Sequence, residues 1–305
     1  MTNNEPTLSK MKEYSYSLDL EGDGTAAKTL RLVGNGKKVL ELGCSVGTQS
    51  RILTEKLGCD VTGVELNPMA AHQAKAYCSR VVVGNLDQIN FETEFHDQKF
   101  NVILCADVLE HIYDPIAMLS KVKSVISSNG YVVASIPNIV HIALIFEMLQ
   151  GRFDYRDIGL LDESHIRFFT RSTLIRTFSE AGFKLEHLDR GLVGPFDTEF
   201  KIVANTSEDH AILDYLRTHN EECFTYHFIV KALPSDAPLA EIQQHNAEFW
   251  LSELDLSNVS MIARDKEKQI EQLQEQVSRL LSQVDWLEKK FIFRLAKSIK
   301  SFLRF

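Results

Sequence analysis

The sequence predicts a doubly wound α/β fold built on a mostly parallel sheet. Short apolar runs alternate with helix-like segments between residues 38 and 136. The runs are continuously apolar rather than alternating, as expected of parallel strands that are buried on both faces. A glycine-rich turn from Gly43 to Gly47 joins the first run to a helix-like segment, and Glu65 ends the second run. Such a turn and acid are typical of a nucleoside-binding sheet edge.

Each element can be placed from its own local pattern. The expected strands are 38–42, 61–65, 81–84, 100–105, 131–136, 183–188 and 223–232, and the expected helices are 49–57, 68–77, 115–127, 139–149, 172–181 and 207–218. Pro68 and Pro115 each stand where the first helical turn tolerates proline, directly after a capping residue, Asn67 or Asp114. Strands and helices in this alternation place the polar strand ends along one edge of the sheet.

Composition excludes several classes of protein. The chain has 305 residues, 44% of them apolar, and a formal net charge of −9. The last stretch, 289–305, is strongly basic, so the remainder is more acidic still, and nucleic acid is not expected as a partner. Five cysteines without C-x-x-C spacing, and the lack of a signal-peptide pattern or membrane span, predict a cytoplasmic protein with reduced thiols. No His, Cys or Asp spacing predicts a metal site.

The glycine-rich turn distinguishes between two cofactor classes. A dinucleotide site needs G-x-G-x-x-G, and the turn here reads G-C-S-V-G with Glu41 set before the first glycine. The stretch resembles the first motif of the class I S-adenosylmethionine-dependent methyltransferases, E/D-x-G-x-G-x-G. Ser45 replaces the middle glycine, which is compatible with the motif if the φ angle of Ser45 is negative. A carboxylate at Glu65 would then bind the two ribose hydroxyls.

Two further motifs narrow the resemblance. The run D-V-L-E-H-I-Y-D-P at 107–115 resembles the ubiquinone-biosynthesis-like branch of these methyltransferases. The pattern S-I-P-N at 135–138, followed by G-R-F-D-Y at 151–155 and G-L-L-D-E-S-H-I-R-F-F-T at 159–170, resembles bacterial methyltransferases found with surface-polysaccharide genes. The resemblance implies a seven-stranded Rossmann-like sheet, with the last strand antiparallel between the fifth and the sixth.

The resemblance also implies a set of functional residues around S-adenosyl-L-methionine. The implied cofactor-binding residues are Glu41, Gly43, Cys44, Gly47, Glu65, Leu66, Asn85, Leu86, Ala106 and Asp107. Asn85 stands where relatives usually carry aspartate, and either it or Asp87 would meet the adenine amino group. His165, then His111, then His141 are candidates for a base or a positioning group, because histidine titrates near neutral pH. Glu110 and His111 could instead form a structural pair.

These features lead to three functional hypotheses. The first is O-methylation of a sugar in a bacterial surface glycan or its precursor. The second is a small-molecule methyltransferase of quinone or secondary metabolism. The third is a non-catalytic assembly factor that uses a coiled coil. Residues 1–36 would cover the cofactor, 37–234 would form the methyltransferase domain, and the insertion 138–170 would cover the substrate or, alternatively, form a dimer contact.

The C-terminal part is expected to form a separate module. A helical linker at 235–260 would lead to a coiled coil at 261–290 and a basic amphipathic helix at 291–305. The heptad positions a and d are taken by Ile270, Leu273, Val277, Leu280, Val284 and Leu287. Branched residues at a with leucine at d favour a parallel homodimer, and the alternative is one long helix packed on the domain. Residues 289–305 would contact the inner face of the cell membrane or a partner glycosyltransferase.

Overall fold

The computed structural model describes residues 19–253, 274–283, 270, 286 and 290. The first half of the expected cofactor-covering segment and all of the expected basic helix therefore lie outside the described residues. The chain divides into two compact units, Met1–Asp255 and Leu256–Phe305. None of the described helices combines the length and the apolar character that crossing a bilayer requires.

The first unit is built on one seven-stranded sheet with the order β3-β2-β1-β4-β5-β7-β6. The strands are β1 (Lys38–Leu42), β2 (Asp60–Glu65), β3 (Arg80–Val83), β4 (Phe100–Ala106), β5 (Ile126–Pro137), β6 (Phe183–Leu192) and β7 (Thr225–Pro234). Neighbours from β3 to β5 pair in parallel, and β7 pairs antiparallel with both β5 and β6. The predicted insertion of the last strand is therefore confirmed.

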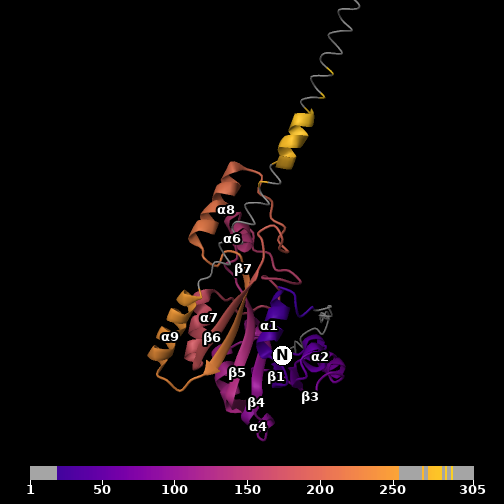
Figure 1. The fold of residues 1–305 in the computed structure, drawn as a ribbon, viewed down its shortest axis with the longest axis vertical. Helices are drawn as coiled ribbons and strands as arrows, with labels where there is room; N and C mark the ends of the chain where they lie inside the picture. The colour runs from indigo at the N-terminus through magenta and orange to yellow at the C-terminus, as the bar shows by residue number, and fades with distance from the viewer. Residues whose placement is uncertain (1–18, 254–269, 271–273, 284–285, 287–289, 291–305) are drawn as a thin grey trace, which may run out of the picture. The chain divides into compact units, whose positions relative to one another are not determined.

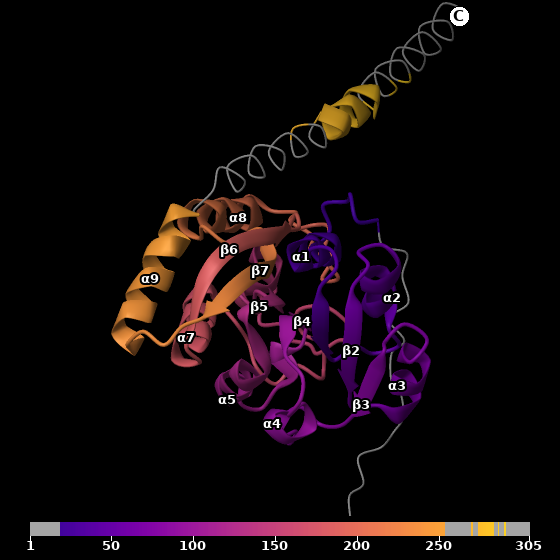
Figure 2. The same cartoon turned by 60° about the horizontal axis from the view of Figure 1, so that its bottom comes forward.

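Helices cover both faces of the sheet (Figures 1 and 2). They are α1 (Thr25–Val33), α2 (Thr48–Glu55), α3 (Pro68–Ala74), α4 (Phe91–Glu94), α5 (Pro115–Val122), α6 (Ile142–Leu149), α7 (Arg171–Glu180), α8 (Ser207–His219) and α9 (Leu239–Ser252), with short 3-10 turns η1 (Leu109–His111) and η2 (Lys123–Val125). One apolar cluster joins α1, α2 and α3 to the sheet, and a second joins α4, α5, α7 and α9 to its other face. The result is a three-layer α/β/α arrangement.

The predicted helix starts have the expected caps. The Asn67 side chain accepts a hydrogen bond from the backbone of Met69, and the Asp114 side chain accepts one from the backbone of Ala117. Each satisfies a donor that the first helical turn leaves without an intrahelical partner. The predicted end of the third helix was too late, because η2 follows α5 and β5 then begins at residue 126 rather than 131.

The predicted linker at 235–260 needs correction. Helix α9 occupies much of that range and packs on α7 and β6 instead of leading away from the domain. Trp250 is fully buried in the apolar cluster, and the Asn246 side chain accepts a hydrogen bond from the backbone N–H of Leu185 at 2.8 Å. Burial of a tryptophan stabilises a fold substantially, so this helix is part of the domain.

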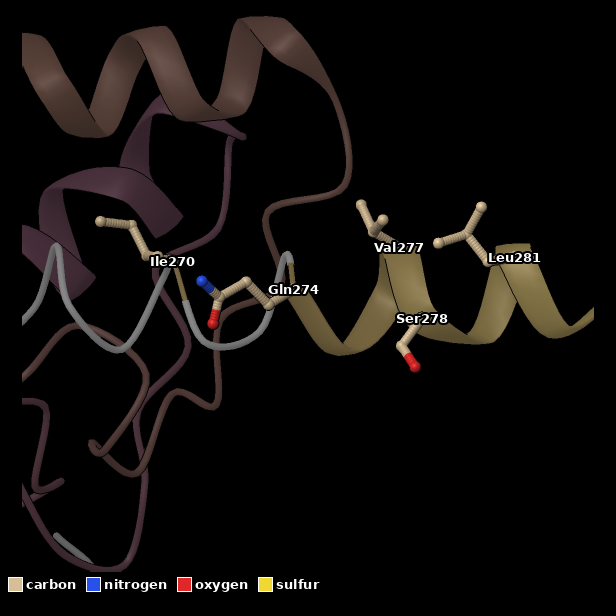
Figure 3. Close-up of a pocket in the computed structure, with 5 residues that line it drawn as sticks. All are labelled: Ile270, Gln274, Val277, Ser278 and Leu281. Carbon is tan, nitrogen blue, oxygen red and sulfur yellow. The ribbon is translucent and has the colours of Figure 1, made fainter.

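The second unit is helical over residues 274–283. Each of its described residues is exposed, including Ile270 and Val277, which both keep 54% of their surface accessible. Figure 3 shows Val277 and Leu281 projecting from the same side of the helix, with Ser278 on the other side. The heptad residues Leu273, Val284 and Leu287 lie outside the described residues.

Candidate active site

The turn between β1 and α2 is shaped by three residues with left-handed backbone angles. Gly43 has φ +69° and Gly47 has φ +85°, and a Cβ at Gly47 would stand only 2.9 Å from the Cα of Ala74. Ser45 has φ +47°, so the condition that we set for a serine at this position, a negative φ angle, is not met. The middle position of the motif thus keeps the conformation that glycine favours although its residue is serine.

The Glu65 carboxylate fixes this turn to the end of β2. The backbone N–H of Ser45 donates to its Oε2 and the backbone N–H of Asn67 donates to its Oε1, both at 2.8 Å. A carboxylate has about four lone-pair sites, so each oxygen keeps further accepting capacity. Leu66, beside it, is 61% exposed at the same edge. The contact of Glu65 with ribose hydroxyls stays a prediction.

Two of the predicted cofactor residues point into the core. The Glu41 side chain is buried and accepts a hydrogen bond from the Ser50 hydroxyl. Burial raises the pKa of this carboxyl to about 8, against an ordinary value of 4.5, even though the Ser50 hydrogen bond opposes the shift. The Cys44 side chain packs within the apolar cluster under α2 and α3. Cys44 therefore contributes to the edge of the sheet through its main chain.

At the end of β3, the Asn85 side chain shapes its own turn. Its Oδ1 accepts the backbone N–H of Asp87 at 2.9 Å, and Oδ1 of Asp87 accepts the backbone N–H of Tyr113 at 3.0 Å. Both side chains thereby fix loops at the edge of the sheet, and which of them would meet an adenine remains a prediction. Leu86 and Ala106 are partly buried against the apolar clusters.

Several polar side chains lie close together where β4 ends. Asp107 has φ +53°, and its Oδ1 accepts the Ser135 hydroxyl at 3.0 Å and lies 3.5 Å from Nε2 of His227. The other ring nitrogen of His227 lies 3.3 Å from the Thr25 hydroxyl of α1. Sequence reasoning missed His227, because only the antiparallel pairing of β7 with β5 brings it to this edge, opposite Pro137.

On the loop that follows Asp107, the structure brings together two of the three predicted histidines, His111 and His165. The rings of His111 and His165 meet edge to face with centroids 4.9 Å apart. Nε2 of His165 lies 3.9 Å from Oε1 of the buried Glu110. The backbone oxygen of Glu110 also accepts the N–H groups of Ile166 and Arg167, each at 2.9 Å, which fixes the insertion to this loop.

Burial dominates the electrostatics of this group. It raises the pKa of Glu110 well above its ordinary value, and the nearby Asp107 carboxylate adds to the effect. Burial also lowers the pKa of His165, and the neighbouring His111 ring lowers it further. Both shifts favour the uncharged forms, so a neutral imidazole stands at this position near pH 7.

The third candidate, His141, occupies a structural position. It is fully buried at the start of α6, where its Nδ1 accepts the backbone N–H of Ala143 at 3.3 Å. Its Nε2 donates to the backbone oxygen of Val193 at 3.0 Å, and burial lowers its pKa to about 4. Both ring nitrogens are engaged by the main chain, which leaves none for an acceptor molecule.

The predicted insertion is closed at its base. Asn138 pairs with Phe169 as an isolated β-bridge, and the N–H of Ile139 donates to the Phe169 oxygen at 2.9 Å. Further along, the ring of Phe153 lies 5.8 Å from that of Tyr155 and 6.3 Å from that of Phe168. The three rings are exposed, so the insertion presents an aromatic surface.

Comparison with known proteins identifies the family. A family model described as a methyltransferase domain matches residues 23–188, more than half of the chain. The ubiquinone biosynthesis O-methyltransferase of Acinetobacter baylyi is 22% identical over 181 residues, 58% of this chain and 76% of its own. That of Azorhizobium caulinodans is 24% identical over 201 residues, 65% of this chain and 79% of its own.

Solved structures of methyltransferases are also similar to this chain. A methyltransferase from Archaeoglobus fulgidus described as SAM dependent matches with a TM-score of 0.49 at 19% identity, over 68% of this chain and 91% of its own. The O-methyltransferase of a trans-AT PKS multienzyme of Brevibacillus brevis was solved with S-adenosyl-L-homocysteine. It matches with a TM-score of 0.49 at 14% identity, over 77% of this chain and 82% of its own. The chain belongs to the methyltransferase-domain family. It is an enzyme whose methyl donor is S-adenosylmethionine.

Proposed function

We propose that the protein methylates a hydroxyl oxygen of a sugar in a bacterial surface glycan or its precursor. The observation that carries O-methylation is the contact between two histidine rings, His111 on the loop that follows the predicted cofactor residue Asp107 and His165 in the insertion, where burial lowers the pKa of His165. A hydroxyl is a weak nucleophile until its proton is removed, and a neutral imidazole is suited to accept that proton.

The residues at the sheet edge fit the methyl donor. The left-handed turn from Gly43 to Gly47 has no side chain at either end, and Glu65 holds a carboxylate beside that turn. S-adenosylmethionine, when bound, supplies a methyl group on a positively charged sulfur, so the methyl carbon needs no acid catalyst. The protein must align the acceptor with that carbon, keep water out and receive the hydroxyl proton.

The sugar acceptor is supported by the insertion. Its sequence pattern resembles methyltransferases found with surface-polysaccharide genes, and its exposed rings of Phe153, Tyr155 and Phe168 offer flat apolar faces on which a sugar ring can pack. A phenolic hydroxyl of a quinone precursor is the second candidate. It is favoured by the relatives described as ubiquinone biosynthesis O-methyltransferases.

Product analysis would decide between these acceptors. We would incubate the full chain with isotopically labelled methyl donor and two panels, nucleotide-linked sugars and catechols, and identify methylated products by mass spectrometry. Label in sugar hydroxyls would support the proposal, and label confined to phenols would replace it with the second candidate. Calorimetry with S-adenosylhomocysteine tests the assembly-factor hypothesis, because a purely structural protein would show no binding.

We also propose that the second unit makes the enzyme a homodimer. Its exposed apolar residues Ile270, Val277 and Leu280 occupy the a and d positions of a heptad pattern, and burying them against a second copy would remove apolar surface from water. Light scattering should give a dimer for the full chain and a monomer for a version ending at Asp255. Flotation with anionic liposomes tests the proposed membrane contact of 289–305, and equal recovery of both versions would refute it.

A further inference from the structure

Two cysteine thiols meet beneath the turn that joins β1 to α2. Cys44 belongs to that turn, and Cys78 lies between α3 and β3. A Cβ built on Gly63 of β2 would stand 2.5 Å from Sγ of Cys44 and 3.3 Å from Sγ of Cys78. The two thiols also form a hydrogen bond with each other. The pair therefore shares the small space that the missing side chain of Gly63 leaves open.

The contacts of the pair make its two members unequal. Cys44 donates the hydrogen bond and Cys78 accepts it, which lowers the pKa of Cys78 and raises that of Cys44. Cys78 also keeps 9% of its surface accessible, against 2% for Cys44. The thiolate is the reactive form of cysteine, so Cys78 is the sulfur that reacts first.

A second hydrogen bond is available to a thiolate at Cys78. The Ser50 hydroxyl lies 3.2 Å from Sγ of Cys78. The pKa of Glu41, raised to about 8 by burial, keeps a proton on that carboxyl, so Ser50 can turn its own hydrogen toward Cys78. Two donors, Cys44 and Ser50, would then stabilise the negative charge on Cys78.

We propose that Cys44 and Cys78 are a reversible oxidation site, at which a peroxide forms a disulfide that weakens cofactor binding. The Cys78 thiolate attacks one peroxide oxygen and the O–O bond breaks, which gives a sulfenic acid and hydroxide. The Cys44 sulfur then attacks the sulfenic sulfur, and the S–O bond breaks with loss of a second hydroxide. The hydroxides take up the two thiol protons, so two thiols and one peroxide give one disulfide and two waters.

A disulfide would move the main chain on which the turn depends. Its sulfur atoms stand about 2.05 Å apart, closer than two sulfurs joined by a hydrogen bond can lie. Cys44 lies between Gly43 and Ser45, which both have left-handed backbone angles. Its backbone oxygen accepts the N–H of Gly47 at 2.9 Å. Drawing Cys44 toward Cys78 would therefore displace the residues that shape this turn.

The displacement would reach the carboxylate that is predicted to bind the cofactor ribose. The N–H of Ser45, the residue after Cys44, donates to Oε2 of Glu65 at 2.8 Å. Loss of one hydrogen bond to a charged group lowers an affinity by about tenfold or more, so the oxidised chain should bind S-adenosylhomocysteine at least about tenfold more weakly. The inference rests on the proposed function for its methyl donor and is independent of the acceptor.

Peptide mapping and calorimetry on the full chain test the site. The reduced protein is treated with hydrogen peroxide and digested without reductant, and mass spectrometry should find the Cys44 and Cys78 peptides linked with loss of two hydrogens. Calorimetry should show S-adenosylhomocysteine binding weakened by the peroxide and restored by a thiol reductant. Cys78→Ser cannot form the bond and should keep its affinity in peroxide. Cys59→Ser, which alters another buried cysteine, is the matched control and should lose affinity as the unaltered chain does.

Each outcome decides one question. The proposal is overturned if peroxide links no Cys44 peptide to a Cys78 peptide, or if the linked protein binds S-adenosylhomocysteine as tightly as the reduced protein. It is also overturned if Cys78→Ser loses affinity in peroxide as the unaltered chain does, because another group is then responsible. If the reduced, unaltered chain does not bind S-adenosylhomocysteine, the proposed function falls, and the linked peptide still decides whether the oxidation site exists.

Discussion

Replacing Glu41 by glutamine should remove a pH-dependent loss of stability from the folded chain. Burial raises the pKa of this carboxyl to about 8, whereas in the unfolded chain it ionises near 4.5. Between these values the unfolded state releases a proton that the folded state keeps. The contribution of Glu41 to stability is therefore complete below pH 4.5 and is lost as pH rises toward about 8.

The size of the effect follows from the two pKa values. One pH unit inside this window corresponds to about 1.4 kcal/mol, so the free energy of unfolding should fall by about 2.7 kcal/mol between pH 5.5 and pH 7.5 on account of this group. Glutamine keeps the volume and can still accept the Ser50 hydroxyl, which now donates to Glu41. The Glu41→Gln protein should lack this part of the decrease in the free energy of unfolding with rising pH.

Urea denaturation at pH 5.5, 6.5 and 7.5 measures the difference. The Glu41→Gln protein should become more stable relative to the unaltered chain as pH rises. Glu55→Gln, an exposed carboxylate on α2, is the charge-matched control, and its stability should run parallel to that of the unaltered chain. If the Glu41→Gln curve also runs parallel, the carboxyl is ionised in the folded state and the reasoning from burial is wrong.

Three further predictions concern other parts of the domain. Gly47→Ala should lower the free energy of unfolding by at least about 2 kcal/mol and abolish cofactor binding, because a Cβ adds strain at φ +85° and a close backbone contact. Gly24→Ala, with open space around its Cβ, should do neither. Urea midpoints measure the stability and calorimetry measures cofactor binding. In the unaltered chain, the free energy of unfolding should fall by about 3 kcal/mol between pH 6.5 and pH 4, because the buried His141 ring resists protonation. His141→Asn keeps a capping side chain at the start of α6 and should lack this decrease. Urea denaturation at these pH values checks it. Glu222→Gln leaves the buried guanidinium of Arg190 without its carboxylate and should cost about 3–5 kcal/mol, and an unchanged urea midpoint would contradict it.

The sheet and its helices were predictable because their signals are local. Continuous apolar runs fix the parallel strands, and the capped prolines at 68 and 115 fix two helix starts. Helices α1 and α4 have no counterpart in the expected set, and α9 was expected only as a linker, because the proline pair at 234 and 238 marks an apparent domain boundary. Trp250, buried against Phe228 at a ring separation of 5.2 Å, and the buried Asn246 show that the chain returns to the core. A tertiary contact of this kind leaves no periodic trace in a short helix.

The candidate site was harder to predict because its chemistry depends on contacts across the chain. Glu110 and His111 are adjacent in sequence, but His165 reaches them from an insertion more than fifty residues later. Motif patterns search for residues at short intervals and overlook contacts of this kind. The sequence proposes His111 and His165 as functional residues, but it cannot say which ring nitrogen carries the proton. Here two backbone carbonyls, those of Ser164 and Leu160, accept from the Nδ1 atoms of His111 and His165 and so decide the position of the proton. The nitrogen that presents its lone pair thus depends on the main-chain conformation around Leu160 and Ser164, which folding of the insertion determines.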